Sequence, residues 1–346
     1  MIPFIFTART QAKSSTIRVL ILIGVMSGAL GSVAVRSPGQ TVSNDTPDTS
    51  TPIMIQPLRL GYLGVGLEVA LPVAAFTELG AFLERDEAVR SAMSREGRRG
   101  VSAYPIDSFQ EMLDRLNLRE FDLAYCPAKI LVEQTGGYVP ILQLRPAAAI
   151  ADTSMSRMTA WRGVIIGSRQ ADLFKGRKPP SSDALGDYLS THRMAFPSAH
   201  SAVGYIYPLL TMQRRFNVSQ PAGFIFLGTS QEVARAVING LIPLGACEEG
   251  ALHEVLQELP YGNRPPWKPE DVVQIIARTP PVPTDPIIVR GELAPERSAL
   301  GQALRDALRR YHDRSADLPK VGESSPANFD QLREDLFLLR SRISLP

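Results

Sequence analysis

Short apolar runs alternate with segments of helical hydrophobic spacing along most of the chain. Apolar runs bounded by turn residues predict β-strands, and recurring apolar positions on one helical face predict amphipathic helices. We expect strands at 57–65, 101–106, 121–127, 138–146, 159–169, 240–249 and twice within 272–291, and helices at 67–85, 108–120, 184–192, 300–312 and 329–343. Two further stretches, 194–210 and 224–240, each join an apolar lead-in, a small polar turn and a helix. This alternation is typical of α/β proteins with largely parallel sheets.

The order of these elements predicts two lobes. The first lobe is expected to comprise residues 56–146 and 282–346, and the second residues 147–281, because a Pro-rich segment leads the chain back after the second group of strands. The chain then crosses one hinge twice and leaves a cleft between the lobes. Ligands of open α/β sheets bind beyond the carboxyl ends of the strands. We therefore expect the binding site in this interlobe cleft.

The segment 194–210 carries the most informative turn. Ser198, His200 and Ser201 precede a helix that contains Gly204 and Pro208. Free backbone N–H groups and the positive end of the helix dipole converge at such a turn. The turn is therefore a candidate anion site.

A second turn of the same kind lies within 224–240, where Thr229 and Ser230 precede a helix. Two such turns in one lobe could grip a small acidic ligand from two sides. The alternative is that each is an ordinary helix cap, since Ser, Thr and Gly are common at helix starts. Glu248 and Glu249 end the strand at 240–249, and a carboxylate there would either pair with an amine on a zwitterionic ligand or cap the next helix.

Composition narrows the class of partner. The 346 residues are 44% apolar and 21% charged with a net charge of +2, as in an ordinary soluble protein large enough for two cores. Clustered basic residues of the kind that bind nucleic acid are not evident, and Arg95, Arg98 and Arg99 are interpreted as a solvated helix end. The four histidines are scattered without metal-ligand spacing, so we expect no metal and no cofactor.

The N-terminus predicts export. Basic residues precede an apolar run at 19–35 that ends in small residues, the order of a secretory signal peptide. We expect a signal peptide at 1–34 with cleavage after Ala34, followed by a disordered linker at 35–55; an uncleaved membrane anchor is the alternative.

The two cysteines admit two interpretations. An exported chain could join Cys126 and Cys247 in a disulfide. Each cysteine ends a strand of a different predicted lobe, however, which favours two separate buried thiols. Neither has a histidine nearby in sequence, and the adjacent pair His200 and Ser201 is poorly placed for catalysis at a helix start. We therefore expect a binding protein and not an enzyme.

Four segments together resemble a known family. That family has, in order, a strand with Gly-Pro, a hydroxyl-rich turn with a helix, a Gly-Ser-His turn with a helix and a strand, and a Pro-containing return segment. This chain has similar segments in the same order, at residues 121–131, 194–208, 228–246 and 277–293. Over roughly residues 57–312 the chain resembles the periplasmic substrate-binding proteins of phosphonate, phosphite and phosphate ABC transporters. The resemblance implies the type II periplasmic-binding-protein fold, with a double-crossover hinge and ligand capture by lobe closure.

The family's turn binds phosphoryl oxygens through hydroxyls and N–H groups, and this chain departs from that turn. Anchored on Gly204 and Pro208, Ser201 keeps the first turn serine, but Ala202 and Val203 replace the next two hydroxyls. Anchored instead on Pro197, His200 and Ser201 fall at the second and third turn positions, so Ser201 is in contact range in either register. Ser230 stands where the family has a turn histidine, and Cys126 where it has glycine. The resemblance therefore predicts the fold and the mode of ligand binding better than it predicts which ligand is bound.

The resulting hypothesis is a periplasmic solute-binding protein that captures a small anionic, phosphonate- or phosphate-like ligand for an ABC importer. Its partners would be that ligand and the transporter permease, with membrane contact only through the permease, no nucleic acid, and a monomeric state. The alternative function is a ligand sensor acting on a membrane signalling partner. The expected ligand-binding residues are Ser201, His200, Ser198, Thr229 and Ser230, with Tyr62, Tyr125 and Glu248 as neighbours.

Overall fold

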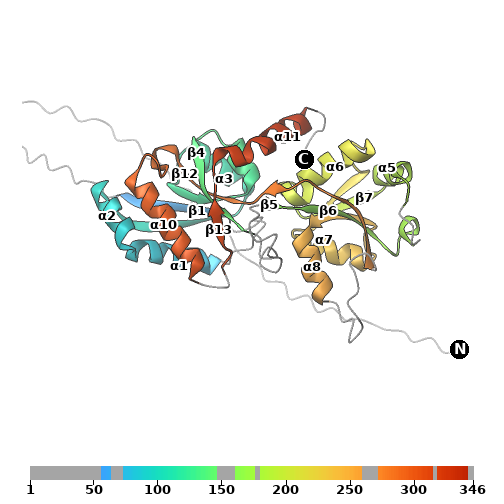
Figure 1. Cartoon of the computed structure of the whole chain (residues 1–346), viewed down its shortest axis with the longest axis horizontal. Helices are drawn as coiled ribbons and strands as arrows, with labels where there is room; N and C mark the ends of the chain where they lie inside the picture. Colours follow the sequence, from blue (N-terminus) through green and yellow to red (C-terminus); the bar gives the residue numbers. More distant parts are fainter. Residues whose placement is uncertain are drawn as a thin grey trace, which may run out of the picture. The chain divides into compact units, whose positions relative to one another are not determined.

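Two larger sheets and one two-stranded sheet form the framework of the residues that the structure describes (Figure 1). The computed structural model describes residues 56–63, 73–145, 160–175, 180–258, 272–314 and 318–341. The fold is mixed α/β, as expected. The predicted signal peptide and linker, residues 1–55, lie outside the described ranges. Within those ranges, no helix has the length and apolar character that a membrane span needs.

The first sheet has six strands in the order β13-β4-β12-β3-β1-β2. Strand β1 pairs in parallel with β2 and β3, whereas β12 runs antiparallel to β3 and β4, and β13 antiparallel to β4. The strand bounds are β1 (Gln56–Leu63), β2 (Arg98–Ile106), β3 (Leu123–Tyr125), β4 (Tyr138–Leu144), β12 (Pro286–Arg290) and β13 (Val321–Glu323).

Helices cover both faces of this sheet because its strand side chains alternate between two hydrophobic clusters. On β3, Leu123 and Tyr125 pack with residues of α1, α2 and α10, while Ala124 packs with residues of α3 and α4. The sequence predicts α3 and α10 well, and misses α2 and the short strand β13. The helix bounds are α1 (Val73–Arg85), α2 (Glu87–Arg95), α3 (Phe109–Asn117), α4 (Ala128–Glu133) and α10 (Ala299–Asp313).

The second sheet has five strands in the order β10-β6-β9-β7-β8. Its core packs Val164 and Ile166 of β6 against α7 and α8, and Ile165 against the cluster that includes α6. The elements are β6 (Gly163–Ser168), α5 (Ser182–Thr191), β7 (Arg193–Phe196), α6 (Tyr207–Phe216), β8 (Gly223–Phe226), α7 (Ser230–Ile238), β9 (Leu244–Glu248), α8 (Glu249–Glu258) and β10 (Val273–Arg278).

Both sheets are mixed, and the expectation of largely parallel sheets is wrong. In the second sheet β7 runs parallel to β8 and β9, but β6 runs antiparallel to β9 and β10. The cause is the double crossing between the sheets. The outgoing segment β5 (Ala160–Trp161) pairs antiparallel with the returning segment β11 (Val282–Pro283). The returning chain then forms β12, which runs antiparallel to its neighbours β3 and β4. The lobe boundaries at 146/147 and 281/282 stay a prediction.

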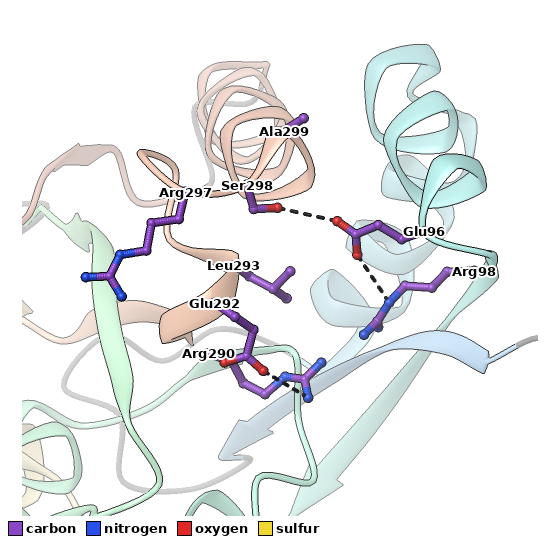
Figure 2. A pocket seen from close by; sticks show the side chains of 8 residues that line it. All are labelled: Glu96, Arg98, Arg290, Glu292, Leu293, Arg297, Ser298 and Ala299. Carbon is purple, nitrogen blue, oxygen red and sulfur yellow. Dashed lines mark hydrogen bonds and ion pairs between the residues drawn. The ribbon is translucent and has the colours of Figure 1, made fainter.

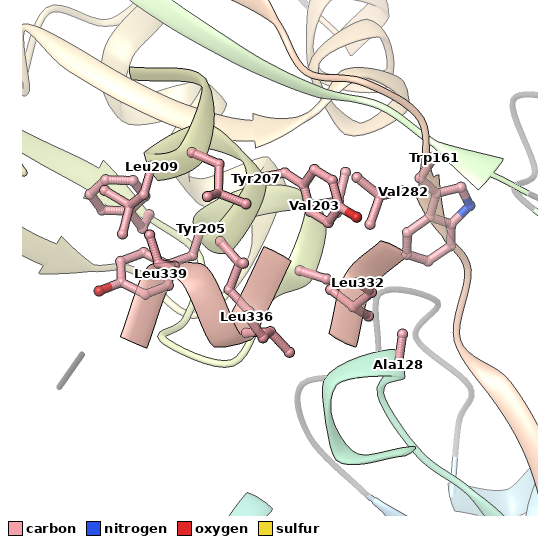
Figure 3. Close-up of a cluster of buried hydrophobic side chains, with 14 of the residues drawn as sticks. Ala128, Trp161, Val203, Tyr205, Tyr207, Leu209, Val282, Leu332, Leu336 and Leu339 are labelled. Carbon is pink, nitrogen blue, oxygen red and sulfur yellow. The ribbon is translucent and has the colours of Figure 1, made fainter. Parts of the chain in front are cut away.

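The last helix, α11 (Asp330–Arg340), contacts elements next to both sheets. It touches α4 of the first lobe, as expected, but its Asp335 carboxylate also accepts a hydrogen bond from Arg214 of α6 at 2.6 Å. Leu336 and Leu339 are buried in the same cluster as Tyr207 of α6 (Figure 3). The sequence predicts packing of this helix on the first lobe, which its contact with α4 confirms, and the structure adds the contact with α6.

Cys126 and Cys247 are separate buried thiols, which confirms the favoured interpretation. Burial raises the pKa of both thiols well above its ordinary value, so neither is a ready thiolate. Among the described residues, no group of His, Cys, Asp and Glu side chains is placed to hold a metal ion.

Candidate functional site

The turn after β7 forms the hydrogen-bonded start of a helix. Ser198 Oγ accepts a hydrogen bond from the His200 N–H at 3.3 Å, and Ser201 Oγ accepts one from the Gly204 N–H at 2.7 Å. Ser201 thereby caps η3 (Ala202–Ile206), a π-helical turn that runs into α6. π-Turns of this kind are frequent at functional sites. Only glycine fits at 204, because a Cβ atom there would lie 2.3 Å from Pro197 Cγ.

His200 is held between two residues of the first lobe. Its ring stacks on Phe109 of α3 with centroids 3.9 Å apart and planes 8° apart, and its Nδ1 lies 3.3 Å from Lys129 Nζ of α4. Burial, and then the Lys129 charge, lower the pKa of His200 to about 4. The imidazole is therefore neutral at pH 7. Since Lys129 can only donate, Nδ1 is the acceptor and Nε2 carries the proton.

Lys129 is the residue that sequence reasoning missed. It is only 6% exposed, and its ammonium lies 3.5 Å from the Ala199 carbonyl oxygen and 4.9 Å from the Phe109 ring centroid. Its carboxylate partner Glu133 is 4.0 Å away and is shared with Arg340. Burial lowers the pKa of Lys129 while Glu133 opposes that shift. Two cations thus share one carboxylate, which leaves excess positive charge beside the 198–201 turn.

The placement of Lys129 follows from its local sequence. Strand β3 ends at Tyr125, and α4 begins directly after Pro127. The Asp285 carboxylate accepts a hydrogen bond from the Ala128 N–H at 3.2 Å, which fixes the start of the helix. A lysine in the buried first turn of an otherwise apolar helix was the available signal, since lysine is almost never fully buried without a reason.

The structure brings the second turn next to the first. The Gly228 N–H donates to the Pro197 carbonyl at 2.9 Å. Thr229 is exposed and caps α7, its Oγ1 accepting from the Glu232 N–H at 3.2 Å. Ser230 is buried, and its Oγ accepts from the Glu248 N–H at 3.1 Å. Two helix starts therefore lie on neighbouring strands of one sheet.

Glu248 caps the helix that follows it. Its two carboxylate oxygens accept the N–H groups of Gly250 at 2.8 Å and Ala251 at 2.9 Å, at the start of α8. Burial raises the pKa of this carboxyl. Of the two interpretations left open by the sequence, capping is the one for which the structure gives contacts; pairing with a ligand amine stays a prediction.

Tyr62 and Tyr125 lie in the hydrophobic core of the first lobe. The Tyr62 ring stacks on Phe76 with centroids 3.9 Å apart, and both tyrosines are at most 3% exposed. The Tyr125 hydroxyl lies 3.0 Å from His312 Nε2. Both tyrosines face the helices α1 and α10, because strand side chains alternate and these two fall on the covered side. Their role in ligand binding stays a prediction to which the structure adds no contact.

His312 predicts how stability depends on pH. Its Nδ1–H donates to the Pro319 carbonyl at 2.7 Å, its Nε2 accepts from Tyr125, and burial lowers its pKa to about 4. Between about pH 6.5 and 4 the unfolded chain takes up this proton and the folded chain does not. We expect the free energy of unfolding to fall by about 2–3 kcal/mol across this window, measured by urea unfolding. His312→Gln should make this fall smaller but not abolish it, because the pKa of His200 is also lowered to about 4. Parallel profiles of the variant and the wild type would contradict the assignment.

The chain matches the family model described as "ABC transporter, phosphonate, periplasmic substrate-binding protein" over residues 80–332. The chain belongs to this family. Its members are substrate-binding transport proteins, with a small-molecule ligand and an ABC transporter permease as partners. Comparison with curated protein sequences gave no match.

Several solved structures share the fold, two of them of phosphonate-binding proteins. PhnD1 from Prochlorococcus marinus, in complex with methylphosphonate, has 13% identity and a TM-score of 0.55, covering 82% of this chain and 98% of its own. The PA3383 binding protein component of an ABC phosphonate transporter from Pseudomonas aeruginosa has 13% identity and a TM-score of 0.53, covering 82% and 87%. XAC2383 from Xanthomonas citri, bound to chloride, has 19% identity and a TM-score of 0.58, covering 83% and 99%. The expected type II periplasmic-binding-protein fold is thereby confirmed.

Proposed function

We propose that this member of the phosphonate-binding family is exported to the periplasm as a monomer and delivers a small oxyanion of the phosphonate or phosphate class to its permease. The signal-like residues 1–34 support export. The observation that carries the ligand class is the nearly buried Lys129 ammonium beside the hydroxyl-bearing 198–201 turn. Methylphosphonate, the ligand in the PhnD1 complex, belongs to the same chemical class.

The proposed ligand contacts are Lys129, the Nε2–H of His200, the hydroxyls of Ser198 and Ser201, and the Ser198 N–H. All of these groups can donate hydrogen bonds, and hydrogen bonds to an ionised acceptor are about twice as strong as neutral ones. Thr229 and Ser230 belong to the same proposal, because their turn is bonded to the first through Gly228. The family's turn has two hydroxyl side chains where this chain has Ala202 and Val203. The positive charge of Lys129 would compensate for the loss of these two hydrogen-bond donors.

Replacement of Ser201 by alanine tests the proposal at the turn. We expect Ser201→Ala to weaken binding of methylphosphonate or phosphate by about 1.5–3 kcal/mol, the range for a hydrogen bond to a charged group. This corresponds to about ten- to over a hundredfold in Kd, measured by calorimetry. Loss of the cap to Gly204 should also lower stability by about 1 kcal/mol.

Gly204→Val is the matched control at the same turn. Its Cβ would meet Pro197 Cγ at 2.3 Å and Ser201 Oγ at 2.9 Å, so we expect a large fall in Tm through crowding. If Ser201→Ala lowers the Tm but keeps the Kd of the wild type, Ser201 is only a cap and the ligand binds elsewhere.

A further inference from the structure

An open pocket of about 570 Å³ lies at the edge of the first sheet, on elements that play no part in the site described above (Figure 2). It is formed where the start of β2 meets the end of β12 and the start of α10. Three arginines and two glutamates dominate its wall. The lining residues are Glu96, Arg98, Arg290, Glu292, Leu293, Arg297, Ser298 and Ala299.

Two of these arginines are held in place by ion pairs with one buried carboxylate. Asp122 is fully buried, and its side chain binds Arg98 Nη1 at 2.9 Å, the Arg59 N–H at 2.8 Å, and the Arg290 guanidinium. The Arg98 and Arg290 side chains are only 16% and 15% exposed. The interpretation of Arg98 as part of a solvated helix end is therefore wrong, because Arg98 begins strand β2. Its guanidinium is preorganised before any ligand arrives.

The wall holds more donors than acceptors. Glu96 lies 3.5 Å from Arg98 Nε and also accepts from Ser298 Oγ, while Glu292 lies 3.4 Å from Arg290 Nη1 and 2.5 Å from Arg119. Each guanidinium has five N–H donors. The buried Nε of Arg290 has no hydrogen-bond partner within the described ranges.

Arg297 adds a cation whose side chain has no partner within the described ranges. Its side chain is exposed at the pocket wall, and no ion pair or side-chain hydrogen bond involves it among the residues that the structure describes. The N-terminus of the 15-residue helix α10 opens beside it at Ala299, so the helix dipole adds further positive potential. An unpaired arginine, preorganised arginines and a helix start thus face one cavity.

We infer that this pocket is a second anion-binding site, for a small oxyanion of the phosphate class. Guanidinium forks match phosphate oxygens in pairs. At the start of α10, Ser298 Oγ already accepts the Leu300 and Gly301 N–H groups, which leaves the Ala299 N–H as a donor. Arg297 and the Ala299 N–H would bind the oxyanion directly, while the Arg98 and Arg290 guanidinium groups would add positive potential to the pocket. The pocket is lined by residues of β2, β12 and α10 and the segments beside them, none of which belongs to the proposed Lys129 site beside the 198–201 turn.

The test follows local NMR signals of the full exported chain during titration with inorganic phosphate. We expect saturable shifts of the Arg297 Nε–H and the Ala299 amide. Arg297→Gln should weaken the Ala299 response by about tenfold or more, the effect of losing one charged donor. Arg333→Gln, which changes an exposed arginine on α11, is the control and should leave the response intact.

Two outcomes would overturn the inference: an Ala299 amide that does not respond to phosphate, or a response that survives Arg297→Gln with the same affinity. The amides of Ala202–Ile206 report the other site in the same titration. Failure of the pocket and failure of the proposed function are therefore observed separately.

Discussion

Lys129→Met should weaken binding of a phosphonate or phosphate about thirtyfold or more, because truncating a buried, hydrogen-bonded charge that faces an ion costs about 2–5 kcal/mol. Methionine keeps most of the length and volume of lysine, so packing against Phe109 is preserved. Calorimetry with methylphosphonate measures the loss.

The same substitution should leave the fold intact. Lys129 is almost buried with a distant carboxylate partner, and Glu133 keeps its ion pair with Arg340 after the change. Replacing a poorly paired buried charge by an apolar side chain is often neutral or stabilising. We therefore expect an unchanged or raised Tm alongside the lost affinity.

Lys175→Met is the matched control, since Lys175 is exposed and pairs only locally with Asp172. It should change neither Kd nor Tm. If Lys129→Met binds methylphosphonate as the wild type does, Lys129 has no part in the site and the excess charge is only structural.

Asp122→Ala should lower the free energy of unfolding by about 3–5 kcal/mol, the cost of leaving buried charges without their partner. The substitution removes the shared carboxylate of Arg98 and Arg290 and the acceptor of the Arg59 N–H. These arginines come from β2, β12 and β1, so one side chain ties three strands together. Urea unfolding at neutral pH measures the effect.

Asp172→Ala gives the comparison at an exposed ion pair, where the Asp172 side chain is 94% exposed. Its cost should be about 0–1 kcal/mol. If Asp122→Ala costs no more than Asp172→Ala, the arginines are solvated well enough without their carboxylate, and the preorganised pocket wall loses its physical basis.

Local signals in the sequence predict most elements of the fold. The cap residues Ser108, Thr229 and Ser298 mark the starts of α3, α7 and α10, where each side chain accepts N–H groups of the first turn. Apolar runs predict the strands, because burial on one or both faces requires them. The sequence does not predict the direction of each strand, because strand direction depends on how the chain crosses between the two sheets.

The side-chain partners at the candidate sites depend on contacts that sequence spacing does not contain. Lys129 and His200 are 71 residues apart, and Asp122 and Arg290 are 168 apart. Neither pair leaves a local pattern. Tyr125 shows that the sequence also does not fix which face of the sheet a side chain lies on. A shift of one residue along β3 decides whether a side chain faces α10 or the hydrophobic cluster on the opposite face. By contrast, the 198–201 turn was found because its hydroxyls and its helix are contiguous.

Isothermal titration calorimetry of the exported chain with phosphonates, aminophosphonates, phosphate, phosphite and sulfonates measures directly whether the 198–201 turn and Lys129 form an anion site. We predict saturable binding of at least one phosphonate- or phosphate-class ligand, together with a raised Tm, and loss of that binding in both Lys129→Met and Ser201→Ala. The titrations are made in an Arg297→Gln background, so that the pocket beside α10 does not contribute to the heat. Binding that persists in both variants there, or no binding of any of these oxyanions when Lys129 and Ser201 are intact, would contradict the proposed site.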